Sequence, residues 1–514
     1  MILNFCLAVL PILFLVVALT VFKMPGFKAC FLSAVVTALV AIFAFNMKVS
    51  EALTASLEGA LNALWPICLV IVAALFVYNL TLETKAMDKI KAMLSGVSTD
   101  KRVLALIIGW GFGCFMEGMA GFGTAVAIPA SILIAMGYEP FTTVIGLLVV
   151  NSTPTAFGSV GVPLVTLSGI TGIDPVVLSG NTAFLQAVIT FVSPFVLVAL
   201  VGKGEGKKNA LSGMWGFTTL AALSFVVPQF AAAKFIGPEL GDIIGSIVCM
   251  IVLVIVSLKS NKETPEDYLV SGIEKVNLTF KEALIAWCPF ILIFVILLLT
   301  SSLVPAIHDP LAAIASKVSV YSGKNPGTLS FAWVNTPGVL IMIAGLIGGL
   351  IQGASLKTIV KIYFKTLVDN WKTIVTICSV LALAKMMGYS GMISAIAALL
   401  VAVTGKFYPL ITPLIGTLGG FVTGSGTSTQ VLFGQLQVET AKAIGSDPAW
   451  LAAANAVGAG IGKMISPQGI AIGCAAAGLA GKESVVLKRT FGYAIAFAIV
   501  AGILCFVMPM VGLV

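Results

Sequence analysis

The chain has 514 residues, of which 59% are hydrophobic and only 10% are charged. A soluble domain carries about 25% charged residues, so this composition excludes an ordinary soluble protein and indicates an all-α polytopic membrane protein. The formal net charge of +8 does not require a nucleic-acid partner, because membrane proteins concentrate lysine and arginine in short cytoplasmic loops. The nine cysteines form no CxxC pair and His308 is the only histidine, so we expect neither a metal site nor a cofactor.

The first half of the chain contains apolar runs that are long enough for membrane-spanning helices. They lie near residues 5–22, 27–46, 60–81, 103–136, 141–171 and 181–202. Glycines divide the run at 103–136 after Glu117, and the arm before Glu117 provides only about 21 Å of helix against a hydrocarbon core of about 30 Å. This run therefore predicts a re-entrant helical hairpin whose tip lies near mid-membrane. A polar interruption at 151–158 predicts that the run at 141–171 is a broken helix.

Two linking spans, near 213–236 and 239–258, and a polar loop at about 259–282 lead to the second half. Its apolar runs lie near 284–303, 331–353, 371–388, 389–404, 408–445, 450–480 and 489–513. The run at 408–445 predicts a second hairpin, split at 424–429, and the run at 450–480 predicts a second broken helix. Glycine, proline and a lone ammonium are all disfavoured in a helix within hydrocarbon, so we expect residues 455–468 to be unwound at a binding site. An ordinary kinked helix is the alternative.

The two halves resemble each other. Trp65 and Trp371 are separated by 306 positions, as are Gly118 and Gly424, and a similar offset relates the two helix interruptions. We therefore predict two repeats, at 1–208 and 284–514, joined by residues 209–283. The lysines and arginines gather on one side of the membrane if both termini lie outside, and this arrangement inverts one repeat relative to the other. The basic loop with Lys203, Lys207 and Lys208 is then cytoplasmic. Inverted repeats with broken helices are typical of secondary transporters.

Four polar clusters converge in this arrangement, namely the two hairpin tips and the two helix interruptions. Helix ends there direct partial positive charge and free N–H groups toward an anion, and the hydroxyl and amide side chains add hydrogen-bonding groups. The candidate substrate-binding residues are Asn151, Ser152, Thr153, Thr427, Ser428, Asn455, Lys463, Ser466 and Gln468.

Two ionisable residues dominate this predicted site. Lys463 is the only cation expected near mid-membrane, and it either attracts a substrate carboxylate or forms a permanent ion pair with Glu117. Glu117 is the only carboxylate expected there, and it either carries a coupling proton or caps the hairpin tip. Intramembrane ionisable groups are usually functional, which favours proton coupling through Glu117. Lys385 lies closer to a span end, where its ammonium is expected to reach the interface.

The blocks at these clusters resemble the L-lactate permease family of bacterial carriers. The matching blocks are EGMAGFGT at 117–124, NSTPTAFG at 151–158, TGSGTS at 423–428, LFG at 432–434, GKMISPQ at 462–468 and GKES at 481–484. The resemblance spans nearly the whole chain and implies an inverted-repeat carrier of the ion transporter superfamily in the bacterial cytoplasmic membrane. It also implies import of L-lactate, and often D-lactate or glycolate, with protons. Met119 and the Ser152-Thr153-Pro154 sequence depart from the family pattern, which bears on substrate preference.

Other functions are weighed against this expectation of a proton symporter that is not an enzyme. A sodium-coupled di- or tricarboxylate carrier is the nearest alternative, although one lysine and no arginine near the site disfavour a multiply charged substrate. An anion channel would differ by its inability to accumulate solute. An intramembrane enzyme lacks support, since no metal cluster or nucleophile–base pair is evident. The oligomeric state is left open.

Overall fold

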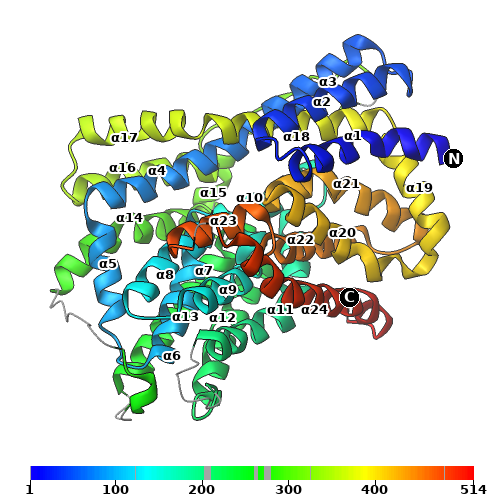
Figure 1. Ribbon diagram of the computed structural model, residues 1–514. Coiled ribbons are helices and arrows are strands. Elements are labelled where there is room, and N and C mark those ends of the chain that lie inside the picture. Colours follow the sequence, from blue (N-terminus) through cyan, green and yellow to red (C-terminus); the bar gives the residue numbers. More distant parts are fainter. Residues whose placement is uncertain are drawn as a thin grey trace.

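A computed structural model of the chain describes residues 2–121, 123–201, 210–259, 264–270, 279–301, 303–324, 326–479 and 481–513. The predicted basic loop with Lys203, Lys207 and Lys208 lies outside the described residues. The described chain is almost entirely helical (Figure 1), as the composition predicts. The exception is a two-stranded antiparallel hairpin of β1 (Ala315–Val318) and β2 (Leu329–Ala332). Strands of four residues are too short to show a clear alternation of side chains, so the sequence does not predict them.

The helices of the first half follow the expected order, with short irregular turns inserted. They are α1 (Ile2–Thr20), α2 (Gly26–Phe43), α3 (Val49–Asn62), the π-helical η1 (Ala63–Cys68), α4 (Leu69–Glu83), α5 (Ala86–Ser95), α6 (Lys101–Leu104), the π-helical η2 (Ala105–Phe112), α7 (Gly113–Met119), α8 (Thr124–Ala135), α9 (Pro140–Val150), the 3-10 turn η3 (Pro154–Phe157), α10 (Gly158–Thr171) and α11 (Pro175–Val201).

The linking segment and the second half complete the chain. Their helices are α12 (Trp215–Phe235), α13 (Pro238–Lys259), η4 (Glu266–Tyr268), α14 (Phe280–Leu299), α15 (Pro305–Ala312), α16 (Pro337–Ile351), α17 (Leu356–Asp369), α18 (Trp371–Tyr389), α19 (Met392–Thr404), η5 (Gly405–Phe407), α20 (Tyr408–Thr423), α21 (Gly426–Ile444), α22 (Pro448–Lys463), α23 (Pro467–Ala476) and α24 (Glu483–Met510).

Eleven helical segments of the described chain are long and apolar enough to cross a membrane, or up to twelve if a bent pair counts as one span. The bent pair is α9 with η3–α10, which turns by 58° where the sequence predicts a broken helix. Long apolar segments in this number are characteristic of a multi-pass membrane protein.

Both predicted hairpins consist of two helices joined by a tight glycine turn. In the first, α7 packs against α8 across a turn in which Gly121 and Gly123 have φ angles of 64° and 85°. In the second, α20 and α21 meet at Gly424, which has a φ of 64°, and at Ser425. Left-handed backbone of this kind is strained for residues with a side chain, so glycine allows the chain to reverse tightly.

The second helix break is shorter than the sequence predicts. Residues 455–463 remain helical as part of α22, and only residues 464–466 separate α22 from α23. The glycines serve close helix packing instead of unwinding. A Cβ on Gly458 would overlap the Pro413 carbonyl, and one on Gly462 would overlap the Thr417 carbonyl, both on α20. Small residues allow this approach because helices within a membrane associate through van der Waals packing.

The helices form two groups. The frame group contains α1–α4, α14 and α16–α18, and the core group contains α6–α13 and α20–α24; Figure 1 shows α2, α4, α17 and α18 together along one side of the core helices. Within the frame group, α2 and α3 pack on α18, and α16 packs on α4. Within the core group, α22 packs on both α20 and α21. Contacts between the groups are sparser than contacts within them.

Lys385 has a partner that the sequence does not predict, a buried acid on the neighbouring helix α3. Its Nζ lies 2.7 Å from Oε1 of Glu58, whose side chain is fully buried. The Tyr389 hydroxyl donates to the same carboxylate at 2.9 Å. An ion pair with an added hydrogen bond offsets the cost of burying the two charges, so this cluster joins α3 to α18 inside the frame group.

Candidate functional site

A cavity of about 400 Å³ lies between the frame group and the core group. Its lining comes from both hairpin tips, from both helix breaks and from helices α2, α4 and α18. The four polar clusters expected to converge therefore do contribute to one space. Its volume is at the lower end of the range for small-molecule sites.

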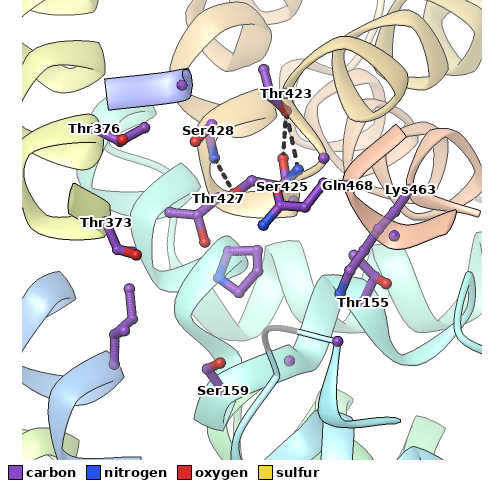
Figure 2. A pocket seen from close by; sticks show the side chains of 18 of the residues that line it. Thr155, Ser159, Thr373, Thr376, Thr423, Ser425, Thr427, Ser428, Lys463 and Gln468 are labelled. Atoms are coloured by element: carbon purple, nitrogen blue, oxygen red, sulfur yellow. Dashed lines mark hydrogen bonds between the residues drawn. The ribbon is translucent and has the colours of Figure 1, made fainter. Parts of the chain in front are cut away.

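The frame group supplies one wall of this cavity. Phe27 at the start of α2 and Lys372, Thr373 and Thr376 near the start of α18 line it. Figure 2 shows the Thr373 and Thr376 hydroxyls across the space from Thr427 and Ser428 of the core group. The cavity can therefore offer hydroxyl groups to a bound solute from two separate groups of helices.

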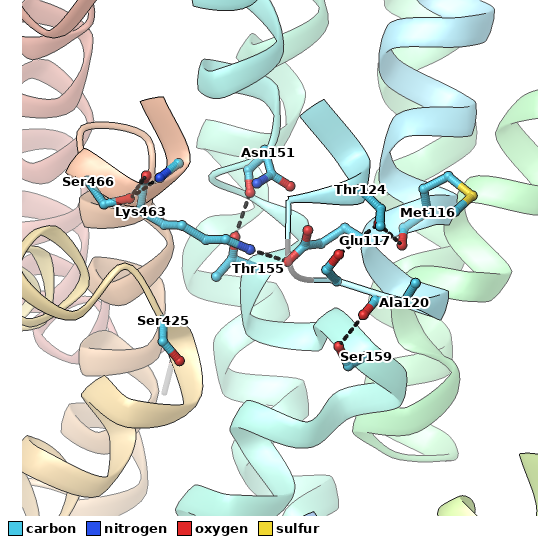
Figure 3. Close-up of polar contacts among 12 residues, drawn as sticks. Met116, Glu117, Ala120, Thr124, Asn151, Thr155, Ser159, Ser425, Lys463 and Ser466 are labelled. Atoms are coloured by element: carbon cyan, nitrogen blue, oxygen red, sulfur yellow. Dashed lines mark hydrogen bonds and ion pairs between the residues drawn. The ribbon is translucent and has the colours of Figure 1, made fainter. Parts of the chain in front are cut away.

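The opposite wall contains a buried ion pair between the two halves of the sequence. The Lys463 Nζ, at the end of α22, binds Oε1 of Glu117 on α7 (Figure 3). The side chains of Lys463 and Glu117 are 11% and 3% exposed, respectively. The second carboxylate oxygen, Oε2 of Glu117, has no hydrogen-bond partner among the described residues. The pair thus contains one satisfied oxygen and one that is free to receive a proton or a hydrogen bond.

The tip of the second hairpin provides donors at a helix start. Ser425 caps α21 by accepting a hydrogen bond from the Ser428 N–H at 3.2 Å. Thr427 lies in the first turn of α21, where backbone N–H groups lack partners within the helix. Gln468, in the first turn of α23, lies beside this tip, and a Cβ on Gly424 would come within 2.7 Å of its Oε1. Two helix N-termini therefore meet at one side of the cavity, which suits an anion.

The first helix break is held against the first hairpin. Ser159 and Val160 have φ angles of 47° and 57°, in the left-handed region that residues with a side chain rarely adopt, and Gly161 follows in the same region. The Ser159 hydroxyl donates to the Ala120 carbonyl at 2.9 Å and so ties this break to the hairpin tip (Figure 3). Strained backbone of this kind persists where surrounding contacts hold it and is concentrated at functional sites.

The structure brings together six of the ten predicted site residues. The cavity is lined by Glu117, Asn151, Thr427, Ser428, Lys463 and Gln468. Asn151 is notable because its Oδ1 has no hydrogen-bond partner among the described residues. An unpaired buried amide oxygen beside a cavity is suited to a hydrogen-bond donor on a bound solute.

The other four predicted residues lie outside the lining and are occupied locally. The Ser152 and Thr153 hydroxyls donate to the carbonyls of residues 149 and 150, and Ser466 caps α23 by accepting from the Gly469 N–H at 3.1 Å. Asn455 is fully buried and exchanges hydrogen bonds with two glutamines of α21, Gln430 and Gln437. This buried network places Asn455 in helix packing, although the sequence aligns it with Asn151.

Several lining residues are not predicted from the sequence. Thr155 lies within the same block as Asn151 and Ser159 directly follows that block, so extending the predicted site along the chain could have included both. Thr373 and Thr376 have no such signal, because they lie within an ordinary apolar span. The sequence also does not predict a role for Asp242 on α13. It lies directly behind Gly118, so Glu117 is not the only buried carboxylate in this region.

No group of three or more His, Cys, Asp or Glu side chains that could hold a metal ion occurs within the part of the chain that the structure describes. The ionisable chemistry of the cavity therefore rests on Glu117, Lys463 and, on the frame wall, Lys372.

Comparison with known proteins shows similarity along almost the entire chain. The family model described as L-lactate permease matches residues 4–512. An L-lactate permease of Streptococcus iniae is 46% identical over 448 residues, which cover 87% of this chain and 93% of that protein. The glycolate permease GlcA of Escherichia coli K12 is 34% identical, and an L-lactate permease of the same strain is 32% identical; each alignment covers 98% of this chain and 95% of the relative.

Proposed function

Because the chain belongs to the L-lactate permease family, we propose that it imports L-lactate and related short 2-hydroxymonocarboxylates, such as D-lactate or glycolate, by proton symport. The related permeases named for lactate and glycolate support this substrate class. A lactate-sized solute is also consistent with a cavity of about 400 Å³ that contains one lysine paired with one acid.

We place the protein in a bacterial cytoplasmic membrane as two inverted repeats, at 1–208 and 284–514, with residues 209–283 between them. The element order supports this division. Helices α1–α5 are followed in the second half by α14 and α16–α19, the pair α6 and α7 by α20, and α8–α11 by α21–α24. The packing between halves also comes in matched pairs. Helix α2 packs on α18 as α16 packs on α4, α10 packs on α21 as α23 packs on α8, and α11 packs on α22 as α24 packs on α9.

The hairpins at 103–136 and 408–445 are re-entrant in this proposal, entering from opposite sides. The 12 residues of α8 are too few to cross a bilayer, and 94% of the apolar window in the adjoining helix Lys101–Met119 is buried within the protein. Both termini lie outside. The wall with Phe27 and Lys372 then faces the cytoplasm, because these residues adjoin the basic loops assigned to that side.

The Lys463–Glu117 ion pair carries the proposal for coupling. A proton that binds to Glu117 neutralises its carboxylate and removes the partner of the Lys463 ammonium. The substrate carboxylate then takes that place, while the 2-hydroxyl group hydrogen-bonds to the free Oδ1 of Asn151 or to Thr427 and Ser428. One proton and one monocarboxylate enter together, so the net charge of the site is unchanged and the cost of burying an extra charge is avoided.

The test is uptake of labelled L-lactate into proteoliposomes with an acidic exterior. We expect uphill accumulation by the wild-type protein, no accumulation when a sodium gradient replaces the proton gradient, and loss of proton-driven accumulation in Glu117→Gln. Glu439→Gln is the matched control, since Glu439 lies on the second hairpin away from the cavity lining, where it contacts only Lys442 and Gln435 of its own helix. Full accumulation by Glu117→Gln would remove Glu117 from the coupling mechanism.

A further inference from the structure

Asp242 is a fully buried carboxylic acid on α13, one of the two helices that link the repeats. The backbone N–H of Gly118 approaches it, but neither carboxylate oxygen completes a hydrogen bond of sound geometry with a described residue. An isolated buried charge costs several kcal/mol, so such a group is stable there mainly in its neutral, proton-bearing form. A structural carboxylate would normally have a cation or several donors around it, and Asp242 lacks both.

Asp242 lies against the residue next to Glu117. A Cβ on Gly118 would come within 2.7 Å of Asp242 Oδ2, so only a glycine allows this approach. On the other side, a Cβ on Gly158 would come within 2.8 Å of Glu117 Oε1. Each acid therefore lies against a backbone position that has no side chain, Asp242 against the residue next to Glu117, and each has at least one oxygen without a partner among the described residues.

A second cavity lies at the start of α13, the helix that carries Asp242. It has a volume of about 360 Å³, and its lining includes Asp174, Glu239 and His308. Glu239 lies one helical turn before Asp242 on α13. The helix ends that line this cavity all lie on the outer side of the membrane in the proposed topology. They are found around residues 174–176, 236–240 and 300–308. In this topology the second cavity thus lies toward the outside, whereas the wall of the substrate cavity with Phe27 and Lys372 faces the cytoplasm.

Few other ionisable groups surround Asp242. Helices α10 and α11 and the turns η2 and η3, which pack against α13, contain none. The ionisable residues of α13 itself and of α7, α12 and α14 are Cys114, Glu117, Lys234, Glu239, Cys249, Lys259, Lys281, Glu282 and Cys288. Lys234 is exposed near the end of α12. Lys259 lies at the end of α13, far along the helix from Asp242, and Lys281 and Glu282 lie in the first turn of α14. Glu117 is therefore the principal charged neighbour within the core group.

We propose that Asp242 is a second proton-binding residue, which passes protons from the outer cavity to Glu117. The inference rests on the proton coupling proposed above. A proton from water in the outer cavity binds a carboxylate oxygen of Asp242 and then moves to Glu117 Oε2, which leaves Asp242 ready for the next proton. The transfer neutralises Glu117 and releases the Lys463 ammonium for the substrate. Protons and lactate thus reach the ion pair by separate routes.

The experiment separates proton-driven uptake from exchange. Proteoliposomes that contain Asp242→Asn or Asp242→Ala are assayed for accumulation of labelled lactate under a pH gradient and for lactate–lactate counterflow at equal pH, which needs no net proton transfer. We expect proton-driven initial rates to fall by about tenfold or more while counterflow remains within about twofold of wild type. Asp242→Glu should restore part of the proton-driven rate with a shifted pH profile. The exposed Asp88→Asn on α5 is the control and should match the wild type in both assays.

The substitutions are expected to fold, because Asp242 forms no sound hydrogen bond that they would break. Wild-type coupling in both Asp242→Asn and Asp242→Ala would overturn the proposal. Loss of counterflow in both would also overturn it, by assigning Asp242 to folding or substrate binding. If the wild-type protein itself shows no proton-driven uptake, the proposed function fails first and this inference fails with it. The two failures are therefore distinguishable.

Discussion

The two helix breaks occupy corresponding places in the chain but have different chemistry. The first, at residues 151–161, places a neutral amide with an unpaired oxygen in the cavity. The second, at residues 464–466, follows a lysine that crosses to an acid of the other half. Position in the chain is thus shared between the halves, while charge is confined to one break. A monocarboxylate needs a single cation, and a second lysine at the first break would attract a second negative charge.

The largest effect is expected for the cation that distinguishes the breaks. Lys463→Met removes the ammonium and leaves the Glu117 carboxylate buried without a partner. An uncompensated buried charge lowers the stability of the fold by about 3–5 kcal/mol. Separately, loss of the ammonium that would bind the substrate carboxylate should reduce lactate uptake or binding by about 100-fold or more. Isothermal titration with purified protein and uptake in proteoliposomes both measure it.

Lys463→Arg is the matched control for charge, and it should retain more uptake than Lys463→Met. Near-wild-type binding by Lys463→Met would show that the ammonium serves only the ion pair. The double variant Lys463→Met with Glu117→Gln then becomes informative, because it removes both charges and should recover stability without recovering uptake.

The next effect concerns the packing of α22 on α20. Gly462→Ala places a methyl group on the Thr417 carbonyl, and backbone cannot move aside as a flexible side chain can, so we expect a loss of about 3 kcal/mol in stability. Thermal unfolding followed by fluorescence-detected size exclusion measures the loss. Gly492→Ala on α24 is the control, because a Cβ there meets nothing within 4 Å and alanine favours a helix, so the unfolding temperature should not fall.

A third prediction compares the two asparagines that the repeat aligns. Asn455→Ala leaves Gln430 and Gln437 without their partners and should lower stability by about 2 kcal/mol, with little change in the lactate concentration at half-maximal uptake. Asn151→Ala should do the opposite, leaving stability almost unchanged and raising that concentration by about tenfold. Equal behaviour of the two variants would contradict the separation of the breaks into one that binds and one that packs.

The smallest effect is expected at the frame wall of the cavity. Lys372 is exposed and lies beside the aromatic rings of Phe27 and Trp371. Lys372→Gln should slow lactate entry by about threefold at low ionic strength, and the difference should fade above about 0.15 M salt because exposed charges are screened. Initial rates of counterflow across a salt series measure it. A salt-independent loss would instead indicate direct contact with substrate.

The sequence predicts the helical fold, both hairpins and both breaks, because glycine, proline and polar residues within apolar runs have few compatible backbone conformations. It does not predict that residues 455–463 remain helical, since the glycine pattern of an unwound segment and of a close helix contact is the same. It also does not predict the partner of Lys385, because Glu58 is more than 300 positions away. Thr373, Thr376 and Asp242 are missed for a similar reason: only tertiary packing brings them to the site.

The position of the Lys463–Glu117 pair within the core group has a mechanical consequence. Both residues, both hairpin tips and both breaks belong to helices that pack closely with one another, whereas Phe27, Thr373 and Thr376 belong to the frame group. If the core group slides along the frame group, Glu117, Lys463 and the bound anion move together, and no charge loses its partner during the movement. The frame group then presents Phe27, the threonine hydroxyls and Lys372 to the passing anion.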